Sequence, residues 1–206
     1  MASGQIRSGM GGWNYEPWHD TFYPKEVSKA KELSYASRHV TAIEINGTFY
    51  RLQKPDVFRK WHDETPDDFV FAIKAPRYIV QRKVLMESKD FLPRFLGSGL
   101  SQLKSKLGPI LWQLPPSTPF DAADLGAFMK LLPHEIDAVP VRHAFEVRHA
   151  SFETPQLVAL AREHRVAIVF ADSDEYPSFA DVSADFIYGR LMRTLKSEPG
   201  AILSCT

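Results

Sequence analysis

Short apolar segments recur along this chain, and stretches with helical spacing separate several of them. Each segment has the length of a buried strand, and most end in a charged or amide residue. The seven segments cover residues 6–10, 42–46, 69–74, 109–113, 144–148, 166–171 and 186–190. Strands that alternate with helices are typical of a parallel sheet with helical crossovers. The sequence therefore predicts an α/β fold.

Helix signals fill several of the intervals. Thr154 is a suitable N-cap, Pro155 suits the first helical turn, and Leu157 and Leu160 follow on one face. Prolines and glycines interrupt the stretch 91–107, so its helix is the least regular. Similar patterns predict helices over residues 30–40, 55–65 and 121–132.

The composition is that of a globular domain. Of the 206 residues, 44% are hydrophobic and 12% aromatic, which is enough to bury a sizeable core. The absence of repeats and linkers predicts one domain over 1–206. The 25 basic and 25 acidic side chains cancel, so no overall field attracts the chain to nucleic acid or membrane. Any such partner needs a local patch.

Cysteine usage and hydropathy set the expected compartment. The single cysteine, Cys205, excludes an internal disulfide framework and a cysteine-rich zinc site. The longest apolar run, 166–171, is too short to span a bilayer, and residues 1–5 lack the apolar core of a signal peptide. We expect a cytoplasmic protein with no membrane partner.

The polar residues at the strand ends locate a candidate site. In a parallel β/α barrel, catalytic residues lie at the C-terminal ends of the strands. Residues two apart on a strand face the same side, so Glu44 accompanies Asn46 and Glu146 accompanies Arg148. If the sheet closes into a barrel, the rim gathers Glu44, Asn46, Lys74, Gln113, Glu146, Asp172 and Arg190.

Several sequence blocks occur in the order of a known family. They are Gly11-Gly12-Trp13, Trp18 with Phe22-Tyr23-Pro24, EINGTFY at 44–50, FVFAIKAPR at 69–77, ILWQLPP at 110–116, FEVRH at 145–149 and YGRL at 188–191. Together they resemble the YecE-like family, domain of unknown function 72, over residues 6–194. The resemblance implies a TIM-like barrel, and it implies no reaction because the family has none established.

The chain departs from the family pattern at three places. Val80 and Gln81 replace a usual Thr-His pair, which removes one candidate proton carrier, and Phe152 replaces a common tryptophan. After Arg190 no run is long enough for an eighth strand. We therefore expect a TIM-like barrel with about seven of eight strands, incomplete at the C-terminus, whose open edges favour self-association.

The rim residues suggest two kinds of role. Glu44, Glu146 and Asp172 are candidate catalytic acids and bases, with proton affinities tuned by Lys74 and Arg190. Lys74 and Arg190 are also candidate anion partners. The alternative is structural, because neighbouring carboxylates and guanidinium groups often do no more than pair, and a lysine at a strand end is often only solvated.

The loops around the rim add aromatic and basic groups. Trp13, Tyr15 and His19 follow the first strand, and Arg77 follows the third. With Asn46, Gln113 and Arg148, they form the candidate ligand-binding set. Aromatic faces beside cations suit a nucleotide, a phosphorylated sugar or an unstacked base.

Familiar catalytic motifs are missing from the sequence. The run Gly9-Met10-Gly11-Gly12 is not followed by the last glycine of a G-x-G-x-x-G dinucleotide turn. No Walker loop or serine nucleophile elbow occurs either. Glu146 and His149 are three apart, a poor spacing for two metal ligands on one strand. We expect neither a cofactor nor a bound metal.

Two functions follow as hypotheses. The first is a metal-independent barrel protein whose C-terminal face binds a small anionic or phosphorylated ligand and which can support acid–base enzyme chemistry. The alternative is a nucleic-acid-binding protein with endonuclease-like ancestry, which would use the basic and aromatic loops.

Overall fold

The computed structural model describes residues 4–193, so Cys205 and the apolar stretch 201–203 lie outside the described residues. Its centre is a parallel six-stranded sheet in the order β1-β2-β3-β4-β7-β8. The strands are β1 (Gly9–Gly11), β2 (Ala42–Ile45), β3 (Val70–Lys74), β4 (Leu107–Gln113), β7 (His143–Glu146) and β8 (Ala167–Ile168). The predicted α/β class is confirmed.

Two short strand pairs accompany the central sheet. β9 (Phe170–Asp172) pairs in parallel with β10 (Gly189–Leu191). β5 (Glu135–Ile136) pairs with β6 (Val139–Pro140) in an antiparallel hairpin. Within the described residues β1 pairs only with β2 and β10 only with β9, so the strands do not close into a ring.

Three predicted strands differ from the observed ones. The predicted strand 6–10 begins before the observed strand β1, because Ile6 is 92% exposed and pairing with β2 begins at Gly9. A Cβ at Gly9 would lie 2.2 Å from the carbonyl oxygen of Ala42, so the close approach of β1 and β2 requires glycine there. The segment 166–171 divides into β8 and β9 because it changes partner from β7 to β10. The last strand is 189–191 rather than 186–190.

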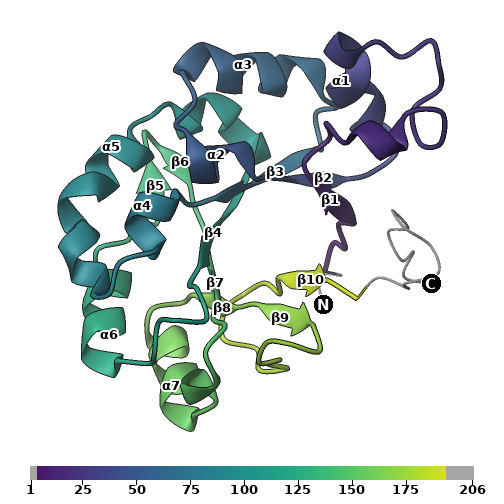
Figure 1. The fold of residues 1–206 in the computed structure, drawn as a ribbon. Coiled ribbons are helices and arrows are strands. Elements are labelled where there is room, and N and C mark those ends of the chain that lie inside the picture. The colour runs from purple at the N-terminus through teal and green to yellow at the C-terminus, as the bar shows by residue number, and fades with distance from the viewer. Residues whose placement is uncertain (1–3, 194–206) are drawn as a thin grey trace.

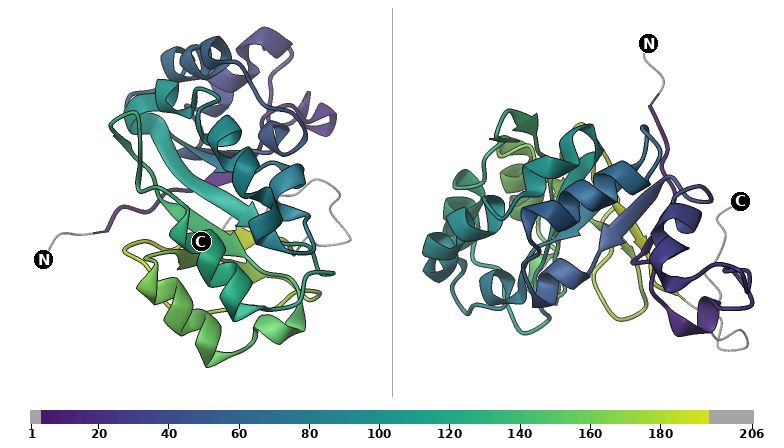
Figure 2. Two further views of the ribbon diagram at one scale, coloured as in Figure 1. Left: turned by 90° about the vertical axis from the view of Figure 1, so that its left-hand side faces the viewer. Right: turned by 90° about the horizontal axis from the view of Figure 1, so that it is seen from above.

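Helices form an outer arc around the strands (Figure 1), and the same layering is visible from two further directions (Figure 2). None of the helices within residues 4–193 is both long and apolar enough to cross a membrane. The α-helices are α1 (Glu32–Ala36), α2 (Gly47–Tyr50), α3 (Pro55–Glu64), α4 (Arg77–Val80), α5 (Leu92–Leu96), α6 (Ala122–Lys130) and α7 (Pro155–Glu163). The 3-10 turns are η1 (Glu16–Trp18), η2 (Lys29–Lys31), η3 (Leu85–Phe91), η4 (Leu100–Lys106) and η5 (Ala150–Phe152).

The predicted cap of α7 is confirmed, and α6 is capped by a side chain as well. The Asp121 carboxylate accepts hydrogen bonds from the backbone N–H groups of Ala123 and Asp124, at 2.9 and 3.0 Å. The Thr154 hydroxyl accepts one from the N–H of Gln156 at 3.4 Å. These bonds satisfy N–H groups that the first turn of a helix leaves without a backbone partner.

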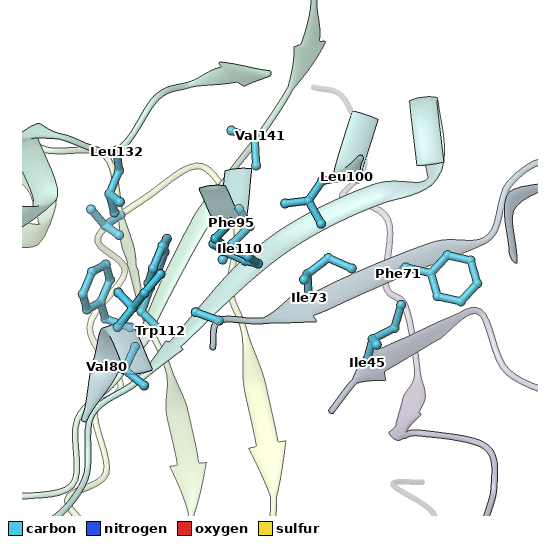
Figure 3. Packing of buried hydrophobic residues seen from close by; sticks show 14 of the residues in the cluster. Ile45, Phe71, Ile73, Val80, Phe95, Leu100, Ile110, Trp112, Leu132 and Val141 are labelled. Carbon is cyan, nitrogen blue, oxygen red and sulfur yellow. The ribbon is translucent and has the colours of Figure 1, made fainter. Parts of the chain in front are cut away.

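The main core lies between the sheet and the helices (Figure 3). The ring of Trp112 packs against Phe95 of α5 and Phe128 of α6, with centroids 5.9 and 5.4 Å apart. All three side chains are fully buried, and each contributes about 1.5–3 kcal/mol of burial free energy. The opposite face of the sheet holds a smaller apolar cluster that includes Leu111 and Ala144.

Candidate functional site

Polar side chains gather beyond the smaller apolar cluster, where the strands end. Leu111 pairs with Ala144, and two positions later Gln113 pairs with Glu146. Strand side chains alternate between faces, so Gln113 and Glu146 share the face of that apolar cluster. We call the group that meets here the Arg190 cluster; its members are Glu44, Lys74, Gln113, Glu146, Arg148, Tyr188 and Arg190.

Arg190 lies at the centre of this group and joins two strands of the central sheet. Its Nε and Nη2 atoms donate to the two carboxylate oxygens of Glu44, at 3.1 and 3.2 Å. Its Nη1 atom donates to Oε2 of Glu146 at 2.6 Å. The guanidinium thus forms a fork with one carboxylate and a short charged bond with another. These bonds engage each of the three guanidinium nitrogens that were predicted to face a ligand.

Glu146 is the most enclosed carboxylate of the cluster, with 1% of its surface exposed. Besides Arg190, it accepts hydrogen bonds from Gln113 Nε2 at 2.8 Å and from Arg148 Nε at 2.6 Å. Burial by itself raises the pKa of Glu146, but the charges of Arg190 and Arg148 and the bond from Gln113 hold it below its ordinary value. Glu146 is therefore an ionised acceptor with satisfied oxygens.

Tyr188 is a member of the site that the sequence analysis missed. Its hydroxyl donates to Oε2 of Glu44 at 2.8 Å. Burial and the charge of Glu44 raise the pKa of Tyr188 well above its ordinary value, so the hydroxyl keeps its proton. The signal was present, because Tyr188 precedes Arg190 by two residues and such residues share a face.

Lys74 ends β3 and differs from the other cations of the cluster. Its Nζ atom lies 4.7 Å from the ring centroid of Phe49, which the sequence analysis also missed, and forms no salt bridge with any carboxylate of residues 4–193. Burial, followed by the charge of Arg190, lowers the pKa of Lys74, although Glu44 and Glu146 oppose this shift. The ammonium group is therefore held near carboxylates without being paired to one.

The backbone around Lys74 is fixed by buried polar contacts. The hydroxyl of Thr48 donates to the carbonyl oxygen of Lys74 at 2.7 Å and to that of Ile45 at 3.0 Å. The next residue, Ala75, donates its N–H to the carbonyl of Leu111 at 2.9 Å. These bonds join the ends of β2, β3 and β4 and set the direction from which the lysine side chain enters the cluster.

Other predicted rim residues lie outside these contacts. Asp172 pairs with Arg193 at 2.9 Å and is in register with Leu191, one position beyond Arg190, so it faces away from that side chain. Asn46 immediately precedes α2, and its side chain lies against β1: a Cβ built on Gly11 would be 3.0 Å from its Nδ2 atom. Arg77 is an exposed residue at the start of α4.

The aromatic loop after β1 packs on itself, on α1 and on α3. Trp13 contacts Trp61 edge to face at a centroid distance of 5.3 Å, and Tyr15 contacts Trp18 at 5.4 Å. His19 bonds through Nε2 to the buried carboxylate of Glu32 at 3.1 Å. Tyr15, which is 48% exposed, keeps the most free surface of the three predicted ligand residues.

Glu146 and His149, the pair weighed as metal ligands, each bond to other groups. Glu146 is occupied by its three polar partners, and His149 accepts a hydrogen bond from the N–H of Ser151 at 3.1 Å as the cap of η5. Residues 4–193 contain no group of three His, Cys, Asp or Glu side chains arranged to hold a metal ion.

A hollow of about 500 Å³ lies beside α7, and its walls include Glu153, Arg162 and Phe179. No member of the Arg190 cluster lines it. Its walls carry no set of convergent buried polar groups. The Arg190 cluster contains such a set, so we take the cluster as the candidate site.

Comparisons with known proteins place the chain in a family. A family model described as "Protein of unknown function DUF72" matches residues 7–201. The chain is similar to the UPF0759 protein YecE of Escherichia coli K12, with 34% identity over 148 residues, or 71% of this chain and 50% of that protein. It is 31% identical to the UPF0759 protein YunF of Bacillus subtilis, over 73% of this chain and 53% of that protein. The chain thus spans about half the length of these relatives.

Solved structures give the same fold. A DUF72 family protein from Thermotoga maritima superposes with a TM-score of 0.68 at 22% identity, over 88% of this chain and 72% of that one. A DUF72 family protein from Enterococcus faecalis gives a TM-score of 0.70 at 20% identity, over 94% and 74%. Together with the sequence matches, these results show that the chain belongs to the DUF72 family of YecE-like proteins.

Proposed function

We propose that the Arg190 cluster binds a small anionic or phosphorylated ligand. The supporting observation is the local excess of positive charge, since three cations, Lys74, Arg148 and Arg190, face two carboxylates, Glu44 and Glu146. Each carboxylate already accepts from Arg190. An incoming anion would therefore pair with Lys74 and with the outer side of Arg148, whose guanidinium carbon lies 4.2 Å from the ring centroid of Tyr176.

The same cluster contains groups suited to acid–base chemistry. Glu44 is 9% exposed and is oriented by the Tyr188 hydroxyl, which donates to it at 2.8 Å, so Glu44 is the candidate base of the cluster. Glu146 is the weaker candidate because it is 1% exposed and two arginines hold its pKa below the ordinary value. Asp172 retains its predicted catalytic role only if a ligand reaches across the β9–β10 edge.

We further propose that the chain forms most of a TIM-like barrel. Three facts support this: the strands follow chain order, the 167–172 segment links β7 to β10, and Arg190 reaches Glu44 on β2. The cluster would then occupy the C-terminal mouth of the barrel, the usual position of chemistry in this architecture.

Nucleic-acid binding remains the second proposal, and the contacts favour it less. Trp13 packs on Trp61 rather than presenting its face, and Arg82 donates to the carbonyl of Tyr78 while stacking on Phe91. Both side chains would have to leave these contacts to stack on bases or to hold phosphates.

Calorimetric titration with inorganic phosphate, pyrophosphate and a short oligonucleotide tests the proposal. We expect Lys74→Met to weaken anion binding by roughly tenfold, the usual loss for one charge-assisted contact. Lys83→Met, which removes an exposed lysine after α4, is the matched control. A small anion that binds equally well to both variants would contradict the assignment, and preferential binding of the oligonucleotide with a steep salt dependence would favour the second proposal.

A further inference from the structure

Lys74 carries an inference that goes beyond anion binding. We propose that Lys74 is a nucleophilic amine that forms an imine with a small carbonyl compound bearing an anionic group, of the 2-oxo acid class. This deepens the proposed function and rests on it, because the anionic group of the substrate would be held by the cations of the Arg190 cluster.

The position of Lys74 suits this role for three reasons. It ends a parallel strand, and hydrogen bonds at the ends of three strands fix its backbone. Its Nζ atom rests against the Phe49 ring and has no salt bridge within residues 4–193 that would have to break before reaction. Its neighbours, Arg190 and Arg148, are guanidinium groups, which are poor nucleophiles.

The surroundings also supply the two requirements of the reaction, a deprotonated amine and a proton carrier. Burial and the nearby charge of Arg190 lower the pKa of Lys74, so more of the amine is neutral than for a solvated lysine. The charge of the Glu44 carboxylate acts on Lys74, and the Tyr188 hydroxyl donates a hydrogen bond to the same carboxylate. Glu44 is therefore the candidate proton carrier, and Tyr188 holds it in place.

The proposed step is balanced. The ammonium of Lys74 gives one proton to Glu44 through an intervening water, because the two groups form no direct ion pair. The neutral amine then forms a C–N bond to the carbonyl carbon, and its nitrogen passes one proton to the carbonyl oxygen, which becomes a hydroxyl. Glu44 then returns a proton to that hydroxyl, the C–O bond breaks with loss of water, and the nitrogen lone pair completes the iminium. One lysine ammonium and one carbonyl therefore yield one iminium and one water, with no oxidant or metal.

Borohydride trapping tests the inference with the full chain. The protein is incubated at pH 7.5 with pyruvate or with acetone, a smaller ketone that lacks the carboxylate, and sodium borohydride then reduces any imine to a stable secondary amine. Peptide mass spectrometry locates the adduct. We expect Lys74 to be labelled by pyruvate at least about tenfold faster than the exposed Lys83, and more slowly by acetone than by pyruvate.

Two variants separate the possible outcomes. Lys74→Arg keeps the positive charge and should retain anion binding while losing the adduct, and Lys83→Arg should change neither. If Lys74 is labelled no faster than Lys83, the imine role is refuted even when phosphate still binds. If acetone labels Lys74 as fast as pyruvate does, the amine is reactive but the anionic substrate class is refuted, whereas the proposed function is refuted only if phosphate and pyrophosphate fail to bind.

Discussion

Replacing Arg190 by methionine tests whether this residue holds the cluster together. The change removes the only group within residues 4–193 that bonds to both Glu44 and Glu146, whose exposed fractions are 9% and 1%. Removing one partner of a buried ion pair typically costs about 3–5 kcal/mol, because a charge is left uncompensated. Glu146 keeps Gln113 and Arg148 and Glu44 keeps Tyr188, so we expect the lower end, about 3 kcal/mol at pH 7.

The loss of unfolding free energy in Arg190→Met should become smaller as the pH falls. In the parent, the pKa of Glu146 is below its ordinary value of 4.5, so its pairing adds stability above that pH, and the contribution disappears as the pH falls through the folded-state pKa. In the variant, the buried carboxylate lacks its main cation, and its pKa rises. Protonation then favours the folded state, and the difference between variant and parent narrows as the pH falls to about 5.

Urea denaturation at pH 7 and pH 5 measures both effects. In a thermal unfolding experiment at pH 7, the melting temperature of the variant should be lower by roughly 6–12 °C for a chain of this length. Arg193→Met is the control, because its partners Asp172 and Asp174 are 27% and 84% exposed and such pairs contribute about 1 kcal/mol or less. A loss in Arg190→Met no larger than in Arg193→Met, or one that grows on acidification, would refute the reasoning.

Three further predictions concern the rest of the fold. Burial lowers the pKa of His143 to about 4, and its Nε2 bonds to the carbonyl of Pro133 at 2.7 Å. The free energy of unfolding should therefore fall as the pH drops from about 6.5 to about 4, and His143→Gln should flatten this pH dependence in urea titrations. Lys106→Met should cost about 1–3 kcal/mol, because the buried Nζ donates to the carbonyl of Thr65 at 2.7 Å; unchanged urea midpoints would contradict this. Leu191 is 51% exposed on the edge of β10 that pairs with no strand of residues 4–193, so light scattering should show self-association that Leu191→Lys reduces; a monomeric parent would count against an open edge.

Local pattern was sufficient for much of the fold. The helices that begin at Ala122 and Pro155 follow from a capping side chain and an apolar stripe, signals that act within one or two turns. The start of β1 could not be read in this way. It depends on how closely Gly9 approaches Ala42, a contact between residues 33 positions apart.

Strand pattern alone was enough to indicate four of the side chains that reach the candidate site. Glu44, Lys74, Gln113 and Glu146 lie at or near the carboxyl ends of parallel strands, and the two-residue period fixes the face of each. The partners of these side chains could not be read from that pattern. The register of β9 with β10 turned Asp172 away, and the approach of β10 brought Arg190 to a carboxylate 146 positions earlier in the chain. Strand periodicity is local, whereas the pairing of charges depends on long-range register, which no short segment encodes.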